Sequence, residues 1–264
     1  MKQNLFWFIP IILLVALAGL YFWPEATQLQ PEPPVAEVPP AQPAIRHPIE
    51  SVDAPENPLP PLAESDGPLD EALVTLLGHK LPQFVYSKNL IHRIVATVDN
   101  LTRDHVALRL MPVKPVPEIP NTENIGENLV LSAQNAERYR NYVRLIDAVP
   151  IDAAVALYAR FYPLFQEQYE SLGYPGKYFN DRVVEVIDHL LTTPEVEEPL
   201  RLVQPRVLYE FADPKLEKLS AGQKILLRMG HANQVKLKAK LLEIRRALVS
   251  MGPTSALRNH NPRS

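Results

Sequence analysis

A run of 19 apolar residues near the N-terminus constrains this chain more than any other feature. The run begins at Leu5, ends at Trp23, contains no charged residue and has one proline, Pro10. As a helix rising about 1.5 Å per residue, it would span about 28 Å, close to the roughly 30 Å of hydrocarbon in a bilayer. The sequence therefore predicts a cytoplasmic end and a transmembrane helix within residues 1–23.

The residues that flank this run predict its orientation. Lys2 is the only charged residue ahead of it, and a positive N-terminal flank favours a cytoplasmic N-terminus. Trp7 near one end, and Tyr21 and Trp23 at the other, are typical of the aromatic belts at membrane interfaces. We therefore expect a single-pass protein whose remaining residues lie outside the cytoplasm.

Two alternatives to this topology stay open at the sequence level. Ala16, Leu17 and Ala18 resemble the small-residue site of a cleaved signal peptide. The apolar run continues past them to Trp23, which suits an anchor better than the start of a mature chain. A body that faces the cytoplasm is the second alternative.

Residues 24–68 have the composition of a linker. They hold 13 of the 28 prolines and eight acidic residues against one basic residue, Arg46. Such a segment cannot bury a core, and its proline pairs favour the polyproline II conformation. It would reach roughly 140 Å fully extended and roughly 40 Å as a flexible coil. The sequence thus predicts an acidic tether between the membrane and a body.

The body is predicted at residues 69–250, followed by a polar, disordered tail at residues 251–264. A domain of this size buries roughly 70% of its unfolded surface, enough to fold without disulfides. The fold class is mainly α, a single multi-helix domain with at most short extended segments. We expect helices capped by Ser87, Ser132, Asp152, Asn180, Asp213 and Ser220, a first helix from Leu69 and a last one from Asn233. Residues 105–111 and 207–211 are the candidate extended segments, and residues 112–129 the irregular loop.

Composition excludes several kinds of chemistry. The chain has no cysteine, so disulfides, thiolate metal ligands and a cysteine nucleophile are ruled out. The seven histidines form no zinc-binding pair, and no phosphate loop, dinucleotide fingerprint or serine elbow is present. We therefore expect no metal and no cofactor, and the sequence identifies no catalytic residue.

Acidic residues in the body are the remaining candidates for catalysis. A glycosidase needs two carboxyl groups within roughly 5–10 Å of each other at a cleft. The candidates are Asp99, Asp181, Glu185, Asp188 and Glu210. Glu185 and His189 could share a helix face, for which a surface ion pair is the simpler interpretation.

The segment 173–180 is the most unusual stretch between two predicted helices. It combines two glycines and a proline with Tyr174, Lys177, Tyr178 and Phe179. These four residues are our candidate ligand or partner loop, because aromatic rings beside a lysine can stack on a sugar or a peptide. The alternative is a helix connection whose rings fill the core.

The C-terminal third is basic and provides a second candidate surface. Lys236, Lys240, Arg245 and Arg246 belong to the last predicted helix and are candidates for binding an anionic partner. A solvated helix face is the alternative interpretation. Nucleic acid is not expected, because the body is predicted to lie outside the cytoplasm.

Four segments resemble a known family. They are Val98-Asp99-Asn100-Leu101, Asn135-Ala136-Glu137-Arg138-Tyr139, the stretch from Leu157-Tyr158 to Tyr162-Pro163-Leu164, and Gln223-Lys224-Ile225-Leu226-Leu227-Arg228-Met229-Gly230. Together they are similar to the DUF3014 family of membrane-anchored bacterial proteins, whose domain has no assigned function. The resemblance implies a protein of the bacterial inner membrane with a periplasmic domain, and it supplies no catalytic residues.

Taken together, the sequence favours a membrane-tethered periplasmic binding or scaffold module that acts on cell-envelope components. The inner membrane is the first expected partner, and an envelope protein or an anionic polymer is the second. The alternative function is an envelope enzyme, such as a cell-wall hydrolase, that uses acidic residues.

Overall fold

Helices predominate in the computed structural model, which describes residues 44–49 and 58–252. This confirms the predicted mainly helical fold class. None of the helices in these two ranges is long and apolar enough to cross a membrane. The predicted anchor with Trp7, Tyr21 and Trp23 lies outside the described residues, as does most of the predicted tail.

Hydrogen bonds connect the N-terminal ends of helices α2 (Asp66–Leu77) and α3 (Leu90–Asn100). Helix α2 ends at Gly78, whose φ of 88° suits glycine. Helix α3 is preceded by Asn89, which is in the left-handed region. The Asp66 carboxylate accepts hydrogen bonds from the backbone amides of Asn89 and Leu90, at 2.7 and 2.9 Å. An acid from a distant segment therefore caps α3, and the predicted cap at Ser87 is wrong.

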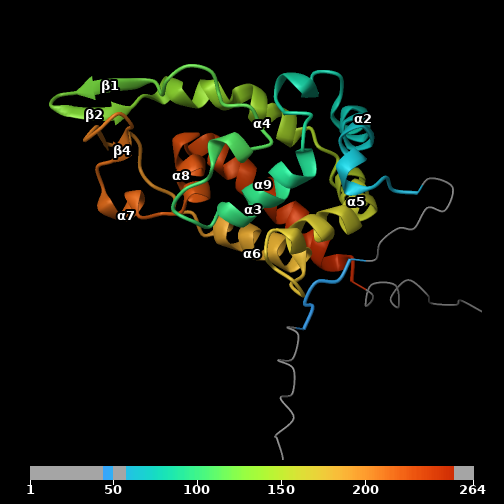
Figure 1. Ribbon diagram of the computed structural model, residues 1–264. Helices are drawn as coiled ribbons and strands as arrows, with labels where there is room; N and C mark the ends of the chain where they lie inside the picture. The colour runs from blue at the N-terminus through green and yellow to red at the C-terminus, as the bar shows by residue number, and fades with distance from the viewer. Residues whose placement is uncertain (1–43, 50–57, 253–264) are drawn as a thin grey trace, which may run out of the picture. The chain divides into compact units, whose positions relative to one another are not determined.

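The predicted irregular loop contains a β-hairpin that we did not expect. Strand β1 (Thr122–Ile125) pairs antiparallel with β2 (Asn128–Leu131), and Thr122 lies opposite Leu131. A second small sheet pairs β3 (Leu202–Val203) with β4 (Glu210–Phe211), and a bridge from Val130 to Arg201 links the two sheets. The hairpin projects from the helices at the left of Figure 1.

Three helices follow the hairpin. Ser132 caps a 3-10 helix (Ala133–Tyr139) that leads into α4 (Arg140–Asp147), so the predicted single helix is divided. Helix α5 (Ile151–Ser171) begins after Pro150 rather than at Asp152, and it continues through Pro163. Helix α6 (Phe179–Leu191) begins after Tyr178. Residues 105–111 form no strand, and Leu108–Leu110 is a 3-10 turn.

The last three helices follow their predicted caps closely. The Asp213 side chain caps α7 (Pro214–Glu217), which has proline at its first position. Ser220 and Gln223 form a capping box at the start of α8 (Ala221–Arg228). Helix α9 (His231–Ser250) begins two residues before the predicted Asn233.

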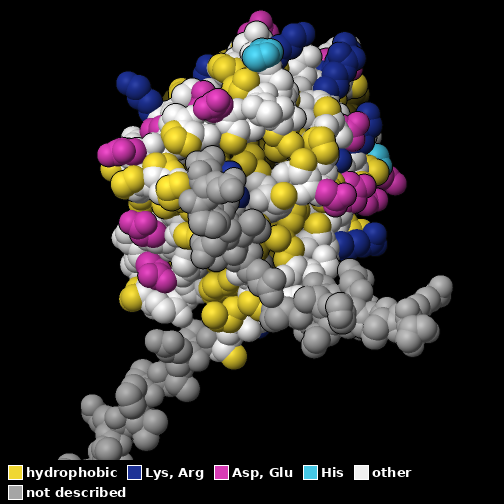
Figure 2. Space-filling model, turned by 90° about the vertical axis from the view of Figure 1, so that its right-hand side faces the viewer, with side chains coloured by type: hydrophobic (Ala, Val, Ile, Leu, Met, Phe, Trp, Pro, Cys, Tyr) yellow, Lys and Arg dark blue, Asp and Glu magenta, His cyan; other side chains and the backbone are white. Residues whose placement is uncertain are grey.

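The main core lies where α3, α5, α6 and α9 pack together (Figure 1). Aromatic rings fill much of it, and Phe161 and Phe179 are almost fully buried. Each such ring contributes roughly 1.5–3 kcal/mol through burial. Figure 2 shows the side that carries α2 and α5, where hydrophobic side chains lie among charged ones.

Part of the predicted linker range packs on this body. Ile49 is 8% exposed and belongs to the main core, and Leu59 and Leu62 pack against the same cluster. Residues 44–49 therefore form a docked segment, which we call the strap.

Helix α8 packs closely against its neighbours at Gly222. A Cβ atom there would lie 2.6 Å from Leu190 Cδ2 and 2.9 Å from the Leu101 carbonyl oxygen, whereas nothing lies within 4 Å of a Cβ at Gly67. We expect Gly222→Ala to lower the free energy of unfolding by about 1–3 kcal/mol through overpacking. Gly67→Ala, in α2, should raise it by about 0.5 kcal/mol. Urea unfolding followed by circular dichroism measures both, and equal effects would contradict this packing.

Candidate functional site

The segment 173–180 borders a cavity of about 520 Å³, which we call the Asp99 cavity. Three of the five acidic candidates and three of the four loop candidates line it, so the fold gathers residues that are distant in sequence. The lining residues are Ala44, Arg46, Asp99, Arg103, Tyr169, Tyr174, Lys177, Tyr178, Asp181, Arg182 and Glu185.

Asp99, in the last turn of α3, organises one wall of the cavity. Its side chain is 8% exposed, and both of its oxygens accept hydrogen bonds. Oδ1 accepts from Arg182 Nε at 3.2 Å. Oδ2 accepts from Arg103 Nη2 at 2.6 Å and from the Tyr174 hydroxyl at 3.0 Å. The Asp99 charge raises the pKa of the Arg103 guanidinium.

Arg182 joins α6 to the C-terminal end of α3. Its guanidinium donates to the Asp99 carbonyl at 2.8 Å, to Thr102 Oγ1 at 2.7 Å and to Glu185 Oε1 at 2.8 Å. A cation suits this place, because the carbonyls at a helix C-terminus carry partial negative charge. The forked geometry of arginine allows one side chain to make all of these contacts, which lysine could not do.

The aromatic part of the wall comes from α5 and the 173–180 segment. The Tyr169 and Tyr174 rings stack with their centroids 4.7 Å apart, and Lys177 Nζ lies 5.3 Å from the Tyr174 centroid. Burial, with a smaller contribution from the Asp99 charge, raises the pKa of Tyr169 to about 12. Tyr169 is therefore neutral at physiological pH and supports the Tyr174 ring.

The strap forms another part of the border of the cavity. Backbone amides of Arg46 and His47 donate to the Asp181 carboxylate at 3.0 and 2.7 Å, and the Ile49 amide donates to the Tyr178 hydroxyl at 2.7 Å. The His47 carbonyl accepts from Asn180 Nδ2 at 2.9 Å. Asn180, the predicted cap, is instead fully buried and holds the strap.

The rim of the cavity is cationic. Arg46, Arg103 and Lys177 are exposed, whereas the acids are engaged by protein donors: Asp99 and Glu185 by Arg182, and Asp181 by the strap amides. Within residues 44–49 and 58–252, no acidic side chain pairs with Arg46 or Lys177. The cavity therefore offers cations to a ligand and keeps its carboxylates occupied.

The other predicted site residues lie elsewhere. Phe179 is 1% exposed in the core, so this ring fills space as the alternative interpretation held. Asp188 pairs with Arg245, and Glu210 lies in β4. His189 Nε2 is 2.9 Å from Ser220 Oγ, while Glu185 contacts Arg182, so the suggested Glu185–His189 pair is not formed.

The four basic candidates on α9 do not act as one group. Lys240 is 13% exposed, lies 3.4 Å from Glu243 and donates to the Val149 carbonyl. Arg245 donates to both oxygens of Asp188. Lys236 and Arg246 are exposed.

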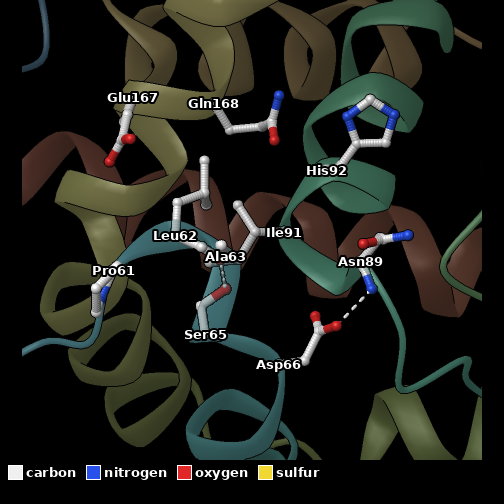
Figure 3. A pocket seen from close by; sticks show the side chains of 10 residues that line it. All are labelled: Pro61, Leu62, Ala63, Ser65, Asp66, Asn89, Ile91, His92, Glu167 and Gln168. Atoms are coloured by element: carbon white, nitrogen blue, oxygen red, sulfur yellow. Dashed lines mark hydrogen bonds between the residues drawn. The ribbon is translucent and has the colours of Figure 1, made fainter.

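A second cavity, of about 490 Å³, lies between α3, α5 and the segment before α2 (Figure 3). His92 and Glu167 lie on opposite sides of it, with Leu62 and Ile91 between them, and Asp66 is occupied by the amides that precede α3. A third, mostly apolar groove of about 540 Å³ lies between α2 and α5. No group of three or more His, Asp or Glu side chains in the described part of the chain could hold a metal ion. The Asp99 cavity is thus the best candidate site.

Sequence reasoning missed four side chains of this site: Arg46, Arg103, Tyr169 and Arg182. The four-residue spacing of Asp99 and Arg103 was an available signal, although α3 ends at Asn100 and Arg103 lies in the turn that follows. No pattern could pair Asp99 with Arg182, because 83 residues separate them.

Fold and site together define a mainly helical domain with a cation-rimmed cavity. The chain matches the family described as "Protein of unknown function (DUF3014)" over residues 90–245, and it belongs to that family. The matched range contains the cavity-lining residues except Ala44 and Arg46. No curated protein and no solved structure matches the chain.

The Asp99 carboxylate is expected to contribute strongly to the stability of the domain. Asp99→Asn would leave the Arg182 guanidinium, 15% exposed, without its buried charge partner, and should lower the free energy of unfolding by about 3 kcal/mol. Asp188→Asn breaks a half-exposed pair and should cost no more than about 1 kcal/mol. Equal losses of stability in urea unfolding would show that Asp99 has no special role.

Proposed function

We propose that this protein is a binding module, and that the Asp99 cavity takes an anionic component of the cell envelope. The proposal rests on one observation. The basic side chains at the rim of the cavity are exposed, whereas its acidic side chains already accept hydrogen bonds from the protein. Arg46, Arg103 and Lys177 reach solvent around a cavity whose acidic groups already accept hydrogen bonds. A carboxylate or phosphate that enters would meet these three cations, and the four basic residues that line the cavity outnumber its three carboxylates.

An envelope hydrolase is the second candidate, because Asp99, Asp181 and Glu185 line one cavity. Acid-catalysed cleavage of a glycosidic bond needs one carboxylic acid that donates a proton to the leaving oxygen. In this cavity each of the three carboxylates accepts hydrogen bonds from arginine or from backbone amides. This arrangement favours binding over hydrolysis.

The stacked tyrosines narrow the class of ligand. Buried Tyr169 supports the half-buried Tyr174 ring, which presents an aromatic edge beside Lys177 and Arg103. Aromatic surfaces pack against sugar and peptide faces, and the cations bind terminal carboxylates or phosphates. An acidic glycopeptide of the wall combines both features.

The ligand proposal predicts that the free cations determine affinity. Muramyl dipeptide, which carries a free carboxylate, and glycerol phosphate, the headgroup chemistry of anionic lipids, would be titrated calorimetrically into the protein. We expect at least one of them to bind, and the double variant Arg46→Gln with Lys177→Gln to weaken that binding roughly tenfold.

The matched control for this titration removes two exposed lysines, Lys215 in α7 and Lys218 directly after it, neither of which lines the cavity. This pair of changes should leave the affinity unaltered. The proposal would be contradicted if neither probe binds, or if both double variants lose the same amount of affinity.

We also propose that residues 5–23 anchor the protein in the bacterial inner membrane, with the body in the periplasm. The charge-free run, the lysine ahead of it and the flanking aromatics support this. Because the strap is docked on the body, only 20 residues separate Trp23 from Ala44. Full extension of those residues would reach roughly 60 Å, less than half of what the whole linker range allows. The body would act near the membrane.

Topology can be measured with enzyme fusions at the C-terminal end of α9. Alkaline phosphatase, which needs an oxidising compartment, should be active when fused after Ser250, and a cytoplasmic reporter at the same place should be silent. Adding three lysines after residue 24 should reduce the phosphatase signal, because positive charge on that flank opposes export. The opposite pattern of reporter activities would contradict a periplasmic body.

A further inference from the structure

The exposed face of α9 carries a heptad pattern that the Asp99 cavity does not use. Ala232, Val235, Ala239, Leu242, Arg246 and Val249 follow one another at alternating steps of three and four residues. The large apolar members are open to solvent: Val235 is 44%, Leu242 37% and Val249 38% exposed. The opposite face of α9 packs against α4, α5, α6 and α8. We call the six exposed residues the α9 seam.

A strict three-four spacing is narrower than the apolar face of an ordinary surface helix. It is the spacing with which one helix lies along another, because each seam residue then fits between residues of the facing helix. The two alanines of the seam leave room for a close approach. Alanine favours any exposed helix, but a solvated face gains nothing from Val235, Leu242 and Val249 at this spacing.

The charges beside the seam identify the facing helix. Lys236 follows Val235, and Glu243 follows Leu242, so opposite charges occupy the same heptad position one heptad apart. The Glu243 carboxylate lies 3.4 Å from Lys240 of its own chain but is half-exposed, so a second cation can still reach it. When two identical helices run antiparallel, this heptad position of one helix faces the same position of the other, so Lys236 meets the partner's Glu243 and Glu243 meets the partner's Lys236. The sequence of α9 is therefore complementary to itself in the antiparallel direction.

The other edge of the seam is compatible with the same pairing. Lys238 would face the partner's Arg245 there, but each of these two side chains is already paired with an acidic residue of its own chain. Lys238 lies 3.6 Å from Glu195, and Arg245 pairs with Asp188. A parallel pair would instead set Arg246 against the partner's Arg246 inside the seam, which is unfavourable.

We propose that the α9 seam binds a second copy of this chain, as an antiparallel helix pair about a two-fold axis. Ala239 lies opposite the partner's Leu242, Ala232 opposite the partner's Val249, and Val235 opposite the partner's Arg246. Each layer combines a small or medium side chain with a larger one, which packs without voids. The proposal is independent of the ligand of the Asp99 cavity.

Sedimentation of the full chain in a mild detergent tests the proposal. The protein should form a dimer, and Leu242→Lys should weaken self-association roughly a hundredfold by placing a charge in the seam. Lys236→Glu and Glu243→Lys should each weaken it roughly tenfold, because each brings like charges together. The double variant with both changes should regain the original affinity, since the swapped charges are again complementary.

Introduced cysteines can test the relative orientation of the two α9 helices, because the chain has no cysteine of its own. Ala232→Cys and Val249→Cys proteins, mixed and oxidised, should form a disulfide between the two variants and none within either variant alone. In an antiparallel pair, equal positions at the two ends lie about 25 Å apart along the helix axis.

Three results would overturn the proposal. These are a monomer at all concentrations, a dimer that tolerates Leu242→Lys, and a disulfide within either single-cysteine variant. If the protein is monomeric and Leu242→Lys instead reduces binding to anionic lipid vesicles, the α9 seam binds a membrane surface and not a second copy. Circular dichroism melting of each variant checks that these exposed substitutions leave the fold intact.

Discussion

The carboxylate of Asp99 joins the end of α3 to two parts of the chain that are distant in sequence, the 173–180 segment and α6. It accepts hydrogen bonds from Arg103 one turn later, from Tyr174 after α5 and from Arg182 on α6. A buried ion pair of this kind stabilises only when its geometry satisfies the remaining donors, and Arg182 meets that condition through Thr102 and the Asp99 carbonyl. Without these contacts, the end of α3 and the start of α6 would no longer be held together, and the cavity that they border would lose its shape.

Asp99 and the strap together explain how a cavity lined by three acidic residues can present cations to a ligand. The acids bind protein donors, which leaves Arg46 and Lys177 facing solvent. Arg46 comes from the predicted linker range, so the chain between the body and the membrane anchor that we propose contributes to the site itself.

Local signals predicted much of the fold, because helix caps and apolar periodicity are local. Asp213, which precedes Pro214, and Ser220 act as caps as predicted. The cap of α3 could not be predicted, since Asp66 lies 23 residues from Asn89. The β1–β2 hairpin was missed because its strands are four residues long and β1 is mostly polar. The 173–180 loop and the acids Asp99 and Asp181 were identified singly, but their assembly depends on tertiary packing.

The central claim is that the Asp99 cavity binds an anionic envelope component in the cell. A benzophenone amino acid in place of exposed Pro175, beside the cavity, should photo-crosslink to wall glycopeptide or anionic lipid. The same group in place of Lys218 should not, and Asp99→Asn should abolish the first crosslink. Equal crosslinking at the two places, or capture only of cytoplasmic molecules at Pro175, would contradict the claim.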